Sequence, residues 1–309
     1  MILMTPLFRS RFIALCATLA VTLGAVGCSS TNSSDDGTLH VSASFYPIAW
    51  LSEQIGGDRV TVTSVTPTNV EPHDYELSPA DVTALSKADL IVYVAGFQPS
   101  MDDAVDQLTG PSVAELSSVA DLQKASSAAV EADGSTSESN LDPHFWLDPV
   151  RMQAVAAEIE RSLAEQDPDN AATYEKNLGA LQQRLTALDS AYETGLATCE
   201  RDTIVTSHAA FSYMANRYGL TQVSISGIDP ESEPSPADLA AVKKAVEETG
   251  TTTIFTESLV SPKTANALAA ETGTETAVLD PMESQPQEDD YLAAMESNLS
   301  ALRTALSCQ

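Results

Sequence analysis

Basic side chains, histidine and cysteine are all scarce in this chain of 309 residues. Fifteen Lys and Arg face 44 Asp and Glu, which gives a formal net charge of -29. Binding to nucleic acid depends on Lys and Arg displacing counterions from phosphates, so this charge argues against a nucleic acid partner. The chain also has no C-x-x-C and no H-E-x-x-H. It therefore lacks the spacings typical of a cysteine zinc site and of a zinc hydrolase.

An apolar run from Phe12 to Gly27 lies near the N-terminus. It follows Arg9 and Arg11 and is short for a membrane span of about 20 residues, so residues 1–27 are predicted to be a secretory signal. Small residues precede Cys28 and a polar stretch follows it, as in a lipoprotein cleavage box. We expect Cys28 to carry a lipid, residues 28–38 to form the tether, and the exported protein to be anchored on the outer face of the cell membrane. Simple cleavage with Cys28 incidental is the alternative.

The four cysteines can be sorted by position. Cys16 is removed with the predicted signal and Cys28 is the candidate for lipidation, which leaves Cys199 and Cys308. In an exported, oxidising setting these two should form a disulfide. A zinc role for this pair is the weaker alternative, because no C-x-x-C spacing accompanies it.

The rest of the chain alternates strand-like and helix-like stretches. Its length suits two compact units, and 43% apolar residues can supply their cores. The alternation predicts an α/β fold, and Ser78 with Asp81 has the pattern of a helix start. The predicted strands are 39–44, 59–66, 90–94, 203–206, 222–226, 252–256 and 276–279. We expect an N-terminal lobe over 39–166 and a C-terminal lobe over 199–309, each with a small parallel sheet.

Leucines and tyrosines recur at intervals of three and four from Pro168 to Thr198. This spacing predicts one long amphipathic helix within a linking segment, 167–198. A helix of about 30 residues would span roughly 45 Å, so it can bridge two lobes rigidly. By contrast, residues 124–140 are rich in Ser, Ala and acidic side chains without apolar periodicity. We expect a solvated acidic surface loop there, and gathering of cations by the loop is the less favoured alternative.

Three of the four histidines occur where predicted strands or loops meet acidic residues or proline. Ligands of parallel sheets gather beyond the carboxyl ends of strands, so we predict that His73, His144 and His208 converge on one metal ion with Asp280. Each alone is weak evidence, because a loop histidine is usually solvated and Asp-Pro often opens a turn. Together, three imidazoles and one carboxylate suit Zn²⁺ before Mn²⁺.

Further acidic side chains are candidates to support these ligands. We expect Glu71 to orient His73, Asp148 to fix the tautomer of His144, and Glu257 to lie behind the ligands at the end of a second-lobe strand. Glu257 is also the main competitor of Asp280 as the carboxylate ligand. The fourth histidine, His40, is expected to be structural or exposed.

These segments resemble the metal-specific solute-binding proteins of ABC importers, the zinc and manganese lipoproteins. The resemblance rests on Glu71–Glu76, Pro143–Pro149, Asp167-Pro168 with Tyr174 and Asn177, Ser207–Phe211 with Tyr218-Gly219, and Phe255–Glu257. It implies two α/β lobes bridged by one long helix, with the metal in the cleft between them, held by residues matching His73, His144, His208 and Asp280. Some relatives have Glu at the third histidine and favour manganese, so His208 indicates zinc. The His-rich loop of many zinc-binding relatives is missing from 124–140.

We therefore expect a non-enzymatic, monomeric protein that captures a divalent metal ion, most favourably Zn²⁺, and delivers it to a membrane permease. Binding should weaken in acid, because imidazoles must lose protons before they coordinate. A manganese-binding counterpart is the nearest alternative. A zinc hydrolase with Glu71 or Glu257 as base, and a surface adhesin that also binds metal, are the rivals from other classes.

Overall fold

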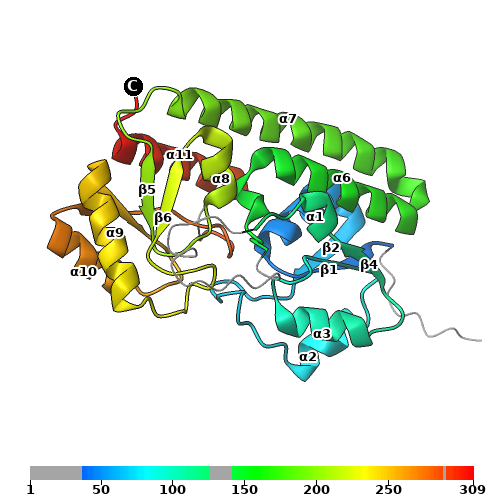
Figure 1. Ribbon diagram of the computed structural model, residues 1–309. Coiled ribbons are helices and arrows are strands. Elements are labelled where there is room, and N and C mark those ends of the chain that lie inside the picture. The colour runs from blue at the N-terminus through cyan, green and yellow to red at the C-terminus, as the bar shows by residue number, and fades with distance from the viewer. Residues whose placement is uncertain (1–36, 125–140, 288–289) are drawn as a thin grey trace, which may run out of the picture. The chain divides into compact units, whose positions relative to one another are not determined.

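Two four-stranded parallel sheets organise the chain, as the computed structural model shows (Figure 1). The first sheet has the order β2-β1-β3-β4, with β1 Leu39–Ala43, β2 Val60–Ser64, β3 Leu90–Tyr93 and β4 Ser112–Glu115. The second has the order β6-β5-β7-β8, with β5 Thr203–Thr206, β6 Thr221–Ser224, β7 Thr253–Thr256 and β8 Glu275–Val278. The predicted α/β class and parallel sheets are confirmed. We call the first sheet with its helices the first lobe and the second sheet with its helices the second lobe.

The structure describes residues 37–124, 141–287 and 290–309. Residues 37–309 form one compact unit, and the predicted limits 39–166, 167–198 and 199–309 stay a prediction. The predicted signal, residues 28–36 of the predicted tether with Cys28, and residues 125–140 of the predicted acidic loop lie outside the described residues. Among the described helices, none is both long and apolar enough to cross a bilayer.

Helices connect the strands of both lobes. They are α1 Tyr46–Gly56, α2 Pro79–Leu85, α3 Pro99–Gln107, α4 Ser117–Ala120, α6 Pro149–Gln166, α7 Ala171–Leu196, α8 Ser212–Tyr218, α9 Pro236–Thr249, α10 Lys263–Thr272 and α11 Tyr291–Leu306, with 3₁₀ turns at Gly57–Arg59, Phe145–Leu147 and Pro168–Asn170. The start predicted at Ser78 is confirmed, because the Ser78 hydroxyl accepts from the Asp81 backbone and the Asp81 carboxylate accepts in return.

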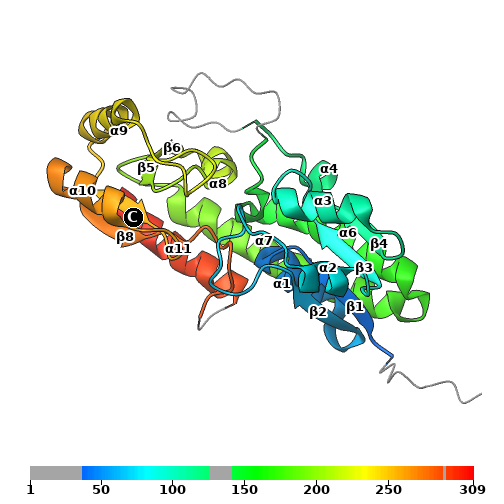
Figure 2. The same ribbon diagram turned by 90° about the horizontal axis from the view of Figure 1, so that it is seen from below.

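The long helix α7 packs against α1 and α6 of the first lobe and α11 of the second, so it bridges the two (Figures 1 and 2). The bridging helix is confirmed, but its start is not at Pro168. A 3₁₀ turn occupies Pro168–Asn170, where the Asp167 carboxylate accepts from Asn170 and Tyr174, and α7 begins at Ala171.

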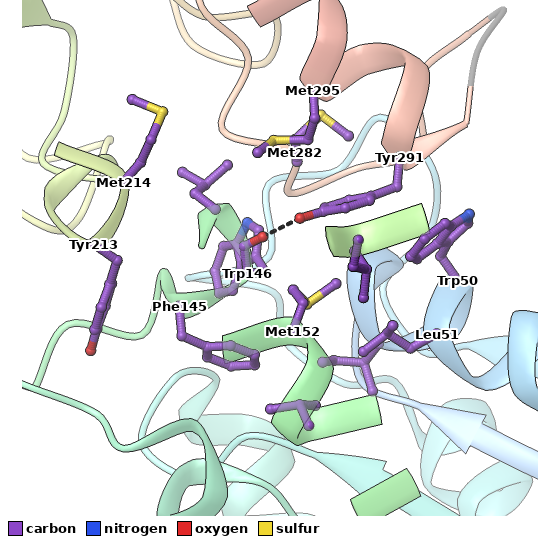
Figure 3. Close-up of a cluster of buried hydrophobic side chains, with 14 of the residues drawn as sticks. Trp50, Leu51, Phe145, Trp146, Met152, Tyr213, Met214, Met282, Tyr291 and Met295 are labelled. Atoms are coloured by element: carbon purple, nitrogen blue, oxygen red, sulfur yellow. Dashed lines mark hydrogen bonds between the residues drawn. The ribbon is translucent and has the colours of Figure 1, made fainter. Parts of the chain in front are cut away.

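One hydrophobic cluster contains side chains from both lobes (Figure 3). Phe145 and Trp146 of the first lobe are fully buried within it. The Trp146 indole donates to the carbonyl of Pro281 at 2.7 Å, and the Tyr291 hydroxyl donates to the carbonyl of Trp146. The turn that follows His144 is therefore fixed against the second lobe.

The predicted disulfide between Cys199 and Cys308 is present in the structure. It joins the segment after α7 to the segment after α11, at a sequence separation of 109. Backbone N–H groups of Glu200 and Arg201 also donate to the carbonyl of Leu306. The C-terminal end of α7 is thereby attached to the last helix of the second lobe.

Candidate metal centre

Four buried side chains from four separate segments meet at one point. They are His73, His144, His208 and Glu283, and one ligand atom from each lies within 4.8 Å of all the others. The first lobe supplies His73 after β2 and His144 before the turn Phe145–Leu147, while the second supplies His208 after β5 and Glu283 after β8. The exposed fraction is 9% for His73, 0% for His144 and His208, and 1% for Glu283. The group is shielded from bulk water.

Five of the six distances within the group match the edges of a tetrahedral ion site. Oε1 of Glu283 lies 3.3 Å from Nε2 of each of the three histidines. Nε2 of His144 lies 3.2 Å from that of His73 and 3.3 Å from that of His208. A tetrahedron's edge is about 1.63 times its centre-to-corner distance, so zinc bonds of about 2.0 to 2.1 Å imply edges of roughly 3.3 to 3.4 Å. These four atoms are spaced to hold one four-coordinate zinc ion.

Two of the imidazoles are oriented by a buried carboxylate behind them. Nδ1 of His144 lies 2.8 Å from Asp142 Oδ1, and Nδ1 of His208 lies 2.7 Å from Glu257 Oε2. Each carboxylate also accepts from the backbone N–H of its histidine. A proton on Nδ1 that is donated to a carboxylate leaves the lone pair of Nε2 free to coordinate a metal.

His73 is held differently. Its ring meets the edge of the Phe97 ring at 4.7 Å between centroids, and burial lowers its pKa. Glu71 accepts from the backbone N–H of His73 and of Asp74, so it shapes the loop and does not touch the imidazole. Across the described ranges, no carboxylate accepts from Nδ1 of His73. This ligand therefore stays neutral more readily than the other two.

Negative charge decides the protonation of the remaining ligands. Burial opposes a charged imidazole at His208, but the charges of Glu257 and Glu283 outweigh it and raise its pKa to about 10. For His144, hydrogen bonds with Asp142 and Glu283 likewise overcome burial and raise the pKa. Burial disfavours the anion at Glu283, yet the neighbouring imidazoles hold its pKa well below the usual range. An incoming cation thus replaces protons in this group.

Asp280 was predicted to be the carboxylate ligand, but the carboxylate that joins the three histidines belongs to Glu283. One Asp280 oxygen accepts from the Ser258 hydroxyl and the other from the backbone of Met282, both at 2.8 Å. This bonding shapes the turn in which Met282 takes a left-handed φ of 63°. Glu283 follows directly and joins the three histidines instead. Its second oxygen, Oε2, is buried without a hydrogen-bond partner among the described residues.

The predicted supporting residues also need adjustment. Glu257 lies behind the ligands, and the imidazole that it contacts is that of His208. Asp148 does not reach His144, because its carboxylate accepts from the backbone of Val150 and caps α6. Asp142 orients His144 in its place. His40 is exposed and lies outside the group, as expected.

Comparisons with known proteins identify the family. The family model described as zinc-uptake complex component A, periplasmic, matches residues 41–305. The chain is 36% identical to the high-affinity zinc uptake system protein ZnuA of Bacillus subtilis, over 92% of this chain and 93% of that protein. It is also 36% identical to the zinc-binding lipoprotein AdcA of Streptococcus pneumoniae, over 90% of this chain but only 58% of AdcA, so it spans little more than half of that relative.

Solved structures show the same fold. The laminin-binding adhesin Lmb of Streptococcus agalactiae superposes with a TM-score of 0.79 at 33% identity, over 87% of this chain and 99% of the other. A Zn(II)-bound mutant variant of AdcAII from Streptococcus pneumoniae gives 0.79 at 32% identity, over 88% and 99%. The expectation of a binding protein and not an enzyme is confirmed by the family. The chain belongs to the ZnuA family of periplasmic zinc-uptake components.

Proposed function

We propose that this protein is the substrate-binding component of an ABC importer, which captures Zn²⁺ and delivers it to a membrane permease. The observation that carries the proposal is the set of five distances of 3.2 to 3.3 Å that join three imidazole nitrogens and one carboxylate oxygen. Zinc is the cargo, and it would bridge His73 and His144 of the first lobe to His208 and Glu283 of the second.

The donor set favours zinc over manganese. Imidazole suits zinc, whereas manganese prefers oxygen donors and six ligands. The group offers three nitrogens and one oxygen in a closed arrangement of four. A manganese ion would need additional oxygen ligands within a site whose members are almost fully buried. Zinc should therefore bind more tightly than manganese.

Binding also fits the site better than hydrolysis does. Catalytic zinc usually keeps three protein ligands and an open position for water, and four protein ligands fill that position. The bases expected of a hydrolase are engaged elsewhere. Glu71 accepts from backbone N–H groups, and Glu257 is bonded to His208.

The cellular setting of the proposal comes from the relatives. AdcA of Streptococcus pneumoniae is described as a lipoprotein. By analogy, this protein would be anchored through Cys28 on the outer face of the membrane and would act as a monomer on its permease. The lipid could be detected by mass spectrometry of the protein isolated from membranes.

The proposal is tested by metal analysis of the purified protein with Zn²⁺ and Mn²⁺ titrations. We expect one zinc ion per chain, bound more tightly than manganese, and loss of binding in His208→Ala. His40→Ala is the matched control, because this exposed histidine lies outside the group. Equal affinity for both metals, or unchanged zinc binding in His208→Ala, would contradict the proposal.

A further inference from the structure

Asp142 connects the ligand His144 to the opposite lobe. This side chain is 1% exposed. Its Oδ1 accepts from the backbone of His144 at 2.9 Å and faces Nδ1 of the same residue at 2.8 Å. Its Oδ2 accepts from the hydroxyl of Ser212, which belongs to the second lobe. One carboxylate thus contacts a first-lobe ligand with one oxygen and a second-lobe helix with the other.

A second contact fixes the backbone of the same residue. The Tyr213 hydroxyl donates to the carbonyl of Asp142 at 2.7 Å and accepts from the backbone of Gln123 at 2.8 Å. Ser212 and Tyr213 are the first two residues of α8, shortly after His208 in the chain. They are 6% and 4% exposed. Two successive buried side chains of α8 therefore hold Asp142 at its carboxylate and at its carbonyl.

The helix that holds Asp142 is itself fixed. The Arg151 guanidinium lies over the Tyr213 ring at 4.6 Å and donates to the carbonyl of Asp121 at 2.6 Å. At the other end of α8, Arg217 and Tyr218 both donate to Asp189 of α7. The start of α8 is thereby tied to the first lobe and its end to the bridging helix.

We propose that Ser212 and Tyr213 are positioning residues for zinc binding, which act through Asp142 on the orientation of His144. This inference rests on the proposed function. Loss of the Ser212 hydroxyl would leave the buried Oδ2 of Asp142 without that donor, which favours another side-chain conformation of Asp142. The orientation of a first-lobe ligand then depends on contact with α8 of the second lobe, in addition to the contacts made by the ion.

The expected loss of zinc affinity depends on how directly each residue contacts a metal ligand. Removing a partner behind a metal ligand typically costs about 10- to 100-fold in metal affinity. Ser212 is one step further from the ion, so Ser212→Ala should weaken zinc binding by about 10-fold, the lower end of that range. Tyr213→Phe should weaken it less, because the Asp142 backbone keeps its neighbours in the chain. Ser212→Thr keeps the hydroxyl and should restore binding.

The experiment measures zinc affinity by chelator competition for the wild type, Ser212→Ala, Ser212→Thr and Tyr213→Phe. Ser162→Ala is the matched control, since Ser162 is also 6% exposed but donates within α6, to the carbonyl of Glu158. The Nδ1 proton of His144 is followed by NMR in the metal-free protein. Ser212→Ala should shift this resonance, whereas Ser162→Ala should not.

The outcomes separate the positioning role from a structural one. Weakened zinc binding in Ser212→Ala, restored in Ser212→Thr, with an altered His144 resonance, supports the proposal. Wild-type affinity in Ser212→Ala, a loss equal to that of Ser162→Ala, or no recovery in Ser212→Thr would overturn it. If Ser212→Ala does not fold, wild-type affinity and an unchanged resonance in Tyr213→Phe overturn it. Failure of the wild type to bind zinc would refute the proposed function. The NMR comparison of the metal-free proteins would still show whether Ser212 orients His144 through Asp142.

Discussion

The two lobes contribute unlike halves to one site. The first lobe provides two imidazoles, and one of them, His73, has its pKa lowered by burial. The second lobe provides His208 and the carboxylate of Glu283, with Glu257 behind the imidazole, and this charge raises the pKa of His208 to about 10. The second lobe thus supplies the charged ligand, Glu283, and an imidazole that retains its proton when no cation is bound. Of the two first-lobe imidazoles, His73 is the readily neutral donor, whereas hydrogen bonds with Asp142 and Glu283 raise the pKa of His144.

The largest expected effect comes from removing the charge of the second lobe's ligand. Glu283→Gln keeps the size of the side chain but removes the charge that faces all three histidines. Zinc affinity should fall by more than about 100-fold, beyond the range for partners behind a ligand. Calorimetric or chelator titrations would measure it. Asp280→Asn is the matched control and should bind much better than Glu283→Gln, so the reverse order would restore Asp280 as the ligand.

The next effect compares Glu257, whose carboxylate lies behind the imidazole of His208, with Glu71, whose carboxylate accepts from the backbone at His73. Glu257→Gln should reduce zinc affinity by about 10- to 100-fold, because it removes the charge bonded to His208. Glu71→Gln should have a smaller effect, since Glu71 accepts only from backbone N–H groups near His73 and an amide oxygen can still accept. Affinity measurements under identical buffer conditions make the comparison. Equal losses in the two variants would remove the asymmetry between the lobes.

The pH dependence of the metal-free protein is the third test. The pKa of His208 is raised from 6.5 to about 10 in the folded state. Stabilisation by its charge is then fully present below about 6.5 and lost as the pH rises through about 10. The melting temperature of the wild type should therefore fall more steeply over this window than that of His208→Asn. Zinc affinity should rise over the same window, because fewer protons must be displaced.

Glu257, Glu283 and His144 face His208 and share this titration, so the slope belongs to the group. If the melting temperatures of the wild type and His208→Asn change equally with pH between 6.5 and 10, His208 is not charged in the metal-free protein.

The smallest effect on zinc is expected from the disulfide of the second lobe. Replacing Cys199 and Cys308 together by Ser should lower the free energy of unfolding by about 2 to 5 kcal/mol. Zinc affinity should stay near that of the wild type, because neither sulfur is among the four ligand atoms. Chemical denaturation and zinc titration of the same sample would check both. A large loss of affinity would show that the link between α7 and α11 controls the site.

The histidines were predictable because they are rare and stand at the ends of strand patterns. Glu283 was not, because it is one of 44 acidic residues and its place depends on distant contacts. Asp280, which begins this turn, is held by Asn298 of α11 and by Ser258. These contacts join residues that are distant in the sequence, so a local sequence pattern does not predict them.

Dependence on the three-dimensional path of the chain also explains why Asp148 was predicted to orient His144, whereas Asp142 does so in the structure. Both flank His144 closely in the sequence, but the turn Phe145–Leu147 directs Asp148 to the start of α6. The strand β4 was missed because only Ala114 in it is buried and Val113 is 46% exposed, so no apolar run marks it. Buried parallel strands such as β3 and β5 were found because all their residues are buried.

The central claim is that one zinc ion is held by two ligands from each lobe. The most direct measurement is a crystal structure of the zinc-loaded protein with anomalous diffraction at the zinc edge. We expect a single peak about 2.0 to 2.2 Å from Nε2 of His73, His144 and His208 and from a carboxylate oxygen of Glu283. A peak coordinated by Asp280 instead of Glu283, or one that involves residues of only one lobe, would contradict it.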